Sequence, residues 1–146
     1  MLAGGPRYRA SMATTETDEY ILGTDREELE RLRLQHAVWT EAQHELMDAG
    51  RLRAGERVLD LGCGPGFTTF ELAQRVGPTG KVLASDMSAR FLEFLRAESA
   101  HLGFAWIETV LGPVEELALP AASLDAAYGR WIFCWLADPL RALERV

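Results

Sequence analysis

The chain has 146 residues, of which 48% are hydrophobic and 25% are charged, a balance typical of a single globular domain. Its formal net charge of −7 disfavours nonspecific binding to nucleic acid, because an acidic surface repels phosphate groups. The sequence contains no apolar run long enough to cross a bilayer and no signal-peptide pattern at its start, so we expect a cytoplasmic protein without a membrane partner.

The first fifty residues divide into a polar stretch and a helical segment. Residues 1–18 are rich in small and polar side chains and poor in apolar ones, which predicts a flexible tail. From Asp25 to Ala49 we expect an amphipathic helix, or two short ones, with Thr24 or Asp25 as the N-cap and Gly50 as the stop. Residues 19–50 would form a helical lead-in or lid segment. The side chains that recur at helical spacing are Leu29, Leu32, Leu34, His36, Trp39 and Leu46.

The remaining residues, 51–146, alternate between short apolar runs and helical patterns. The apolar runs predict strands over residues 57–61, 81–85, 104–111 and 124–128. Helices are expected over residues 67–76 and 88–101, and again from Pro139 to the end. This order predicts an α/β domain with a doubly wound, mostly parallel sheet. Sheets of this class usually continue beyond a fourth strand, so we expect a sheet that is truncated there, with a bare edge on that strand.

A glycine-rich turn joins the first predicted strand to the first predicted helix. Its glycines, Gly62, Gly64 and Gly66, let a ligand approach the backbone, and the following helix offers free N–H groups. A dinucleotide-binding turn needs its last glycine where this chain has Phe67, and a large ring there would obstruct packing of the helix on the strand. The spacing therefore favours a single adenosyl ligand over a dinucleotide.

Asp86 ends the second predicted strand, twenty residues beyond Gly66. A carboxylate at that place can accept hydrogen bonds from both hydroxyls of a ribose. The geometry is common to sites for nicotinamide dinucleotides and for S-adenosylmethionine, so Asp86 alone does not discriminate between these cofactors.

Several segments in combination resemble the motifs of class I S-adenosylmethionine-dependent methyltransferases, which have a Rossmann-like fold. These segments are residues 58–66, 82–88, 112–117 and 123–128. The stretch from Tyr20 to Trp39 is similar to the lead-in helix of bacterial small-molecule methyltransferases. The resemblance implies an enzyme that transfers a methyl group from S-adenosylmethionine to a small molecule by in-line displacement.

The resemblance also implies roles for individual residues. Asp60 would hold the amino group of the cofactor, while the loop that surrounds its methionine part would comprise Gly62, Cys63, Gly64 and Gly66.

The other implied cofactor contacts lie after the later strands. Asp86 would bind the ribose, and Met87 would pack against the adenine. Val114 would offer its backbone N–H to the adenine ring, and Arg130 would line the floor of the site through its backbone. Pro113 stands where the family often has an acidic residue, so adenine recognition here would depend on backbone contacts and packing.

No catalytic base is assigned, because a carbon nucleophile needs only orientation and only a protonated nucleophile needs a base. His36 is expected to be a packed or surface histidine. The aromatic group Trp131, Phe133 and Trp135 is expected to be mostly core, with Trp131 also placed to flank the transferred methyl group.

Two cysteines in unrelated contexts, Cys63 and Cys134, predict neither a disulfide framework nor a metal site.

Two alternatives to the methyltransferase stay open. They are a non-catalytic or truncated nucleotide-binding module and an NAD(P)-dependent oxidoreductase. The sequence predicts neither the methyl acceptor nor the oligomeric state.

Overall fold

A computed structural model of the chain describes residues 26–146. The predicted tail over residues 1–18, the first part of the lead-in segment over residues 19–25 and the helix cap at Thr24 or Asp25 lie outside this range. The strands are β1 (Arg57–Leu61), β2 (Lys81–Asp86), β3 (Ile107–Leu111) and β4 (Ala126–Gly129). The helical elements are α1 (Arg26–Ala49), α2 (Phe67–Val76), α3 (Ala89–Leu102), the 3₁₀ turn η1 (Val114–Glu116) and α4 (Pro139–Leu143).

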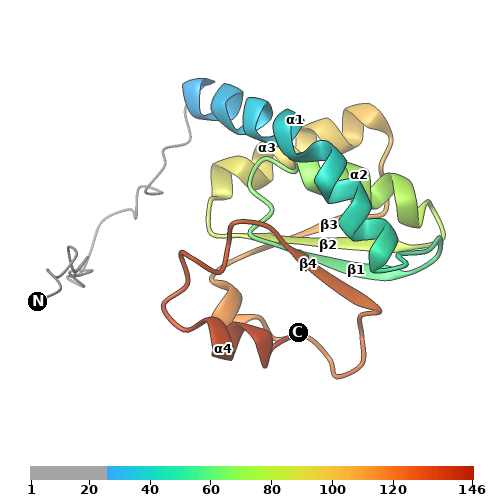
Figure 1. Cartoon of the computed structure of the whole chain (residues 1–146), viewed down its shortest axis with the longest axis vertical. Helices are drawn as coiled ribbons and strands as arrows, with labels where there is room; N and C mark the ends of the chain where they lie inside the picture. Colours follow the sequence, from blue (N-terminus) through green and yellow to red (C-terminus); the bar gives the residue numbers. More distant parts are fainter. Residues whose placement is uncertain (1–25) are drawn as a thin grey trace, which may run out of the picture.

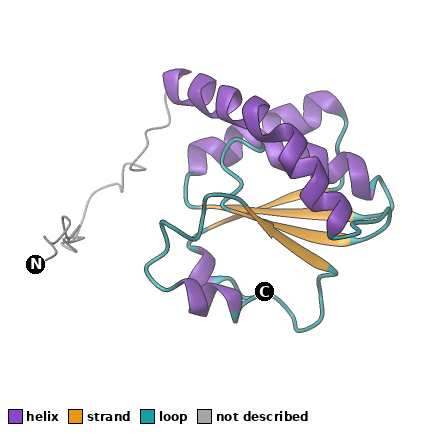
Figure 2. Ribbon diagram, in the orientation of Figure 1, coloured by secondary structure: helices purple, strands orange, loops and turns teal. Residues whose placement is uncertain are grey.

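The strands form one parallel sheet in the order β3-β2-β1-β4. Helices α1, α2 and α3 lie over one face of the sheet, and α4 lies on the other face (Figure 1, Figure 2). This arrangement confirms the predicted doubly wound sheet. The chain places β2 on one side of β1 and β4 on the other, so the strand order reverses at the carboxyl ends of β1 and β4. Ligands of open α/β sheets bind at such a point.

Alternation of side chains along β1 divides its residues between the two faces of the sheet. Val58 packs with residues of α2, whereas Leu59 and Leu61 join a cluster on the opposite face with Val114 and Ala142. Asp60 therefore points to the same face as Val58. The fold thus buries a carboxylate under α2, immediately before the glycine loop.

Helix α1 is a single helix, and only part of its predicted apolar face is covered, because Leu29, Leu32 and His36 are half-buried and the other three residues are exposed. Leu34, Trp39 and Leu46 expose 62%, 43% and 57% of their surface. The buried residues of α1 are Glu28, Gln43 and Met47. The physical reason is that polar side chains make most of the contacts that hold α1 against α2, and these contacts turn the helix away from its apolar stripe.

Strand β3 begins three residues later than the apolar run predicts. Gly103 takes the left-handed conformation at the end of α3, and the N–H of Phe104 then donates to the carbonyl of Ser99 at 2.9 Å. The indole N–H of Trp106 donates to the carbonyl of Ala73 at 2.9 Å. The first part of the run therefore packs against α2, and only Ile107 and the residues after it pair with β2.

Within the part of the chain that is described, β4 pairs with β1 and with no other strand. None of the helices over residues 26–146 combines the length and the hydrophobicity needed to span a bilayer.

Candidate cofactor site

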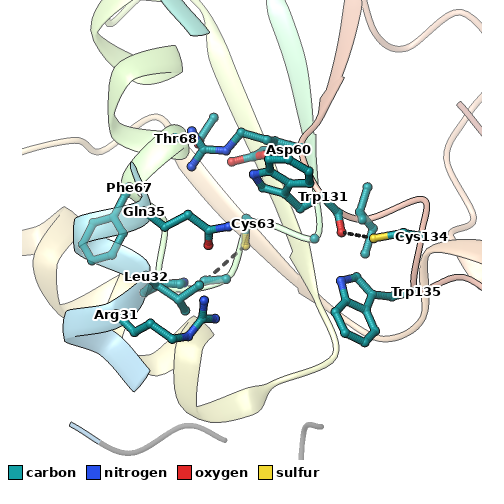
Figure 3. Close-up of a pocket in the computed structure, with 15 residues that line it drawn as sticks. Arg31, Leu32, Gln35, Asp60, Cys63, Phe67, Thr68, Trp131, Cys134 and Trp135 are labelled. Carbon is teal, nitrogen blue, oxygen red and sulfur yellow. Dashed lines mark hydrogen bonds between the residues drawn. The ribbon is translucent and has the colours of Figure 1, made fainter. Parts of the chain in front are cut away.

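A pocket of about 240 Å³ opens at the carboxyl ends of β1 and β4, where the strand order reverses. Asp60 and the glycine loop form its inner wall. Side chains of α1 line one side, and residues of the segment after β4 line the other (Figure 3). The α1 residues are Arg31, Leu32 and Gln35, and the later segment contributes Arg130, Trp131, Ile132, Cys134 and Trp135.

Asp60 is the buried carboxylate of this pocket, with 2% of its surface exposed. Its Oδ2 accepts a hydrogen bond of 2.7 Å from the Thr69 hydroxyl. Burial raises the pKa of Asp60 from 3.8 to about 7, although the hydrogen bond from Thr69 and the positive charge of Arg130 both oppose this shift. A cationic partner would stabilise the charged form of such a carboxylate, which agrees with the predicted contact between Asp60 and the amino group of the cofactor.

The three glycines of the loop serve different purposes. A Cβ at Gly62 would lie 2.6 Å from the side chain of Ile132, so this glycine permits close packing within the protein. A Cβ at Gly66 would lie 2.3 Å from Leu95 of α3. At Gly64, which lines the pocket, a Cβ would meet no atom within 4 Å. Gly64 is therefore the loop glycine that leaves space for a ligand.

The close contact at Gly66 is with Leu95 of α3, so it differs from the helix-on-strand packing at the last glycine of a dinucleotide loop. Phe67 lies at the start of α2, lines the pocket, and has its ring centroid 5.7 Å from that of His36 on α1. The ring therefore contacts the lead-in helix.

Replacing Gly66 by Ala is expected to destabilise the fold by about 2 to 4 kcal/mol, because a left-handed residue would also overpack Leu95. Gly64→Ala is the matched control, since Gly64 is also left-handed but has open space, and it should cost only about 1 kcal/mol. Urea denaturation of both variants measures the difference. Equal losses would show that backbone strain alone, without the Leu95 contact, sets the cost.

Asp86 lies at the end of β2, buried like Asp60, with 3% of its surface exposed. Its Oδ2 accepts a 2.8 Å hydrogen bond from the N–H of Gly64, and its Oδ1 accepts one of 2.8 Å from the N–H of Ser88. Burial raises the pKa of Asp86, and the backbone hydrogen bonds oppose that shift. Asp86 thus fixes the conformation of the glycine loop, a role the sequence did not reveal.

Only some of the residues that were predicted to bind the cofactor line the pocket. Asp60, Gly62, Cys63, Gly64 and Arg130 line it.

The remaining predicted residues, Gly66, Asp86, Met87 and Val114, are not among the residues that line the pocket. Met87 exposes 58% of its surface beside Asp86, whereas Val114 is buried at the start of η1. Ribose and adenine contacts by these residues stay predictions.

Arg130 follows β4 and reaches across to α1 through its side chain. Its Nη1 donates to Oε1 of Gln43 at 2.7 Å, and its Nη2 bonds to Nδ1 of His36 at 3.2 Å. Gln43 also accepts from the Thr68 hydroxyl at 3.0 Å and donates to Glu71 of α2. The family resemblance implies only a backbone role for Arg130, and neither Gln43 nor Glu71 belongs to a motif in the sequence.

His36 is a packed histidine, as expected, and lies between two charged groups. Its Nε2 is 2.9 Å from the Glu71 carboxylate, which can only accept, so Nε2 carries the proton and Nδ1 accepts from Arg130. Burial lowers the pKa of His36, which keeps the ring neutral in this arrangement. Both ring nitrogens are thus engaged in holding α1 in place.

The expectation that the aromatic group after β4 is mostly core is wrong. Trp131, Phe133 and Trp135 expose 50%, 37% and 53% of their surface. The chain leaves the sheet at Gly129, and Trp131 takes a left-handed conformation with φ 62° that turns the segment along the pocket. Trp131 also lies edge-on to Trp39 of α1, with ring centroids 5.6 Å apart.

A family model described as a methyltransferase domain matches residues 58–146. Aklanonic acid methyltransferase DauC of Streptomyces sp. (strain C5) is 34% identical over 77% of this chain and 51% of its own length. The ubiquinone/menaquinone biosynthesis C-methyltransferase UbiE of Pseudomonas savastanoi pv. phaseolicola is 33% identical over 76% of this chain and 44% of its own.

Among solved structures, a SAM dependent methyltransferase from Aquifex aeolicus is 28% identical with a TM-score of 0.66, over 70% of this chain and 55% of that one. The chain spans about half the length, or less, of the curated relatives that it matches. Because the family match covers more than half of the residues, the chain belongs to the S-adenosylmethionine-dependent methyltransferase family.

Proposed function

We propose that this chain is the cofactor-binding part of an enzyme that transfers a methyl group from S-adenosylmethionine to a small molecule. The observation that carries the proposal is the pocket at the carboxyl ends of β1 and β4, where Asp60 and the glycine loop share one wall. The domain boundaries, with a lead-in segment over residues 19–50 and the α/β domain over 51–146, are part of this proposal.

The residues present fit the cofactor. The buried carboxylate of Asp60 suits the ammonium group of an amino acid, and Gly64 leaves open space beside it. Asp86 has carboxylate lone pairs beyond the two that accept backbone N–H groups, which can accept from a ribose. Met87 has an exposed side chain that can cover an adenine ring. When bound, the cofactor supplies a methyl group on a sulfonium, and the chain's task is to orient it and exclude water.

The acceptor is proposed to be an apolar molecule that contains a ring. One relative is named as a methyltransferase of aklanonic acid, and another as a C-methyltransferase of ubiquinone and menaquinone biosynthesis. Trp131 and Trp135 line the pocket and expose about half of their surface, which suits a flat apolar partner. The acidic net charge disfavours a nucleic acid as the acceptor. A cytoplasmic location stays a prediction.

Calorimetric titration of the chain with S-adenosylmethionine and, in parallel, with NADH tests the cofactor assignment. We expect saturable binding of the first and none of the second. The Gly64→Val variant should lose binding, because the added side chain would fill the open space at the loop. Gly103→Val is the matched control, since Gly103 is also left-handed with no atom near its Cβ but lies at the end of α3, outside the pocket lining. Binding of NADH alone, or equal losses in both variants, would refute the proposal.

A further inference from the structure

Arg130 has no carboxylate partner within ion-pair distance among residues 26–146. The two groups that it contacts, the amide oxygen of Gln43 and Nδ1 of His36, are both neutral acceptors. A guanidinium has five N–H donors, and these two bonds engage two of them. A partly buried arginine on a pocket wall therefore retains both its charge and donors for an anion.

The charges of the pocket form a complementary pair. Asp60 precedes the end of β1, Arg130 follows β4, and these two strands are neighbours in the sheet, with Leu61 opposite Gly129. Both side chains line the same pocket, and the guanidinium is near enough to oppose the rise in the pKa of Asp60. The pocket is thus lined by a carboxylate and a guanidinium that come from neighbouring strands. An α-amino acid has the matching charges, because its ammonium group and its carboxylate are bonded to the same carbon atom.

We propose that the side chain of Arg130 binds the carboxylate of the cofactor's methionine part, while Asp60 binds its ammonium group. This inference rests on the proposed function. It assigns Arg130 a side-chain role in place of the backbone role that the family resemblance implies. Gln43 and His36 are positioning residues, because their hydrogen bonds hold the guanidinium at the wall of the pocket.

Arg31, the other arginine that lines the pocket, is less suited to this role. Its Nε and Nη2 donate to the two carboxylate oxygens of Glu28 at 2.7 and 2.6 Å. This bidentate pair already neutralises its charge. Arg130 is held by neutral groups instead, so an incoming carboxylate has no bound carboxylate to displace.

Two ligands that differ only in the carboxylate test the proposal. These are S-adenosylmethionine and decarboxylated S-adenosylmethionine, which keeps the sulfonium and the ammonium group. The wild-type chain is expected to bind the first about 10- to 100-fold more tightly, the usual effect of a hydrogen-bonded charge pair. Arg130→Gln should remove most of this preference by weakening S-adenosylmethionine alone. Arg130→Lys keeps the charge but loses the planar fork, and it should retain an intermediate preference.

The controls separate this role from a structural one. Arg75→Gln makes the same change of charge in an arginine that pairs with Asp48 outside the pocket, and it should leave the preference intact. If Arg130 only fastened α1, Arg130→Gln would weaken both ligands equally, and that result would overturn the inference. If Arg130→Gln does not fold, an unchanged preference in Arg130→Lys would overturn it as well. A wild-type chain that binds both ligands equally refutes this inference alone, whereas one that binds neither also refutes the proposed function.

Discussion

The free energy of unfolding of the Asp60→Asn variant, relative to that of the wild type, is expected to rise with pH. The expected rise is about 4 kcal/mol between about pH 4 and about pH 8. The reason is the burial of Asp60, which raises its pKa from 3.8 to about 7 in the folded chain. Asparagine has almost the same shape, keeps an oxygen for the Thr69 hydroxyl, and carries no charge. The gain should be measurable by urea denaturation at the two pH values.

The sign follows from proton linkage. The pKa of Asp60 is higher in the folded chain than in the unfolded chain, so between the two values the folded chain binds more protons. The contribution of Asp60 to stability is therefore greatest below pH 3.8 and is lost as pH rises through about 7. The pKa of Asp86 is raised and that of His36 is lowered, but both groups are present in the wild type and in Asp60→Asn. The difference in stability between the two proteins therefore reports on Asp60.

The same substitution should weaken binding of S-adenosylmethionine by at least about tenfold, because the ammonium group loses its charged acceptor. A gain in stability with a loss of binding is the expected signature of a charge retained for function. Asp48→Asn is the matched control, since Asp48 is exposed and pairs with Arg75 at the surface. It should leave binding of S-adenosylmethionine unchanged, because Asp48 does not line the pocket. A difference for Asp60→Asn that does not change with pH would contradict the burial argument.

The Asp86→Ala variant is expected to lose stability and cofactor affinity together. The N–H groups of Gly64 and Ser88 would lose their acceptor, which costs about 1 to 3 kcal/mol for each group that stays buried. Loss of two ribose hydrogen bonds should weaken cofactor binding by a further 1 to 3 kcal/mol, roughly. Urea denaturation measures the first effect, and calorimetry with S-adenosylhomocysteine measures the second.

Ser88→Ala provides the comparison for Asp86→Ala. It removes the hydroxyl that caps α3 by accepting from the N–H of Phe91 at 3.2 Å, but it leaves the carboxylate in place. We expect a loss of about 1 kcal/mol in stability and an unchanged affinity. If Asp86→Ala kept full affinity, the ribose would have to lie elsewhere. If it kept full stability, the glycine loop would not depend on this carboxylate.

Local patterns in the sequence were sufficient to predict the order of the elements and the position of the glycine loop. The predicted bounds of β1 and α2 agree with the structure, because an apolar run, a glycine turn and a helix pattern follow one another without ambiguity. The predicted start of β3 was wrong, and the predicted apolar face of α1 was only partly right. In both places apolar side chains suited two packings equally well, and only contact with α2 distinguished them.

The sequence by itself determined a parallel α/β domain with acidic residues at the ends of its first two strands, since strand and turn preferences act between near neighbours. Only the tertiary structure decided what the side chains of Arg130 and Asp86 contact. Arg130 meets Gln43 and His36 from 87 and 94 residues away, and Asp86 meets Gly64 from 22 residues away. The contacts of Arg130 depend on how α1 packs beside the loop, and the contact of Asp86 depends on how β2 pairs with β1. No spacing along the chain encodes either arrangement. The glycine loop was therefore predictable as a motif, whereas the charges around it were settled by packing.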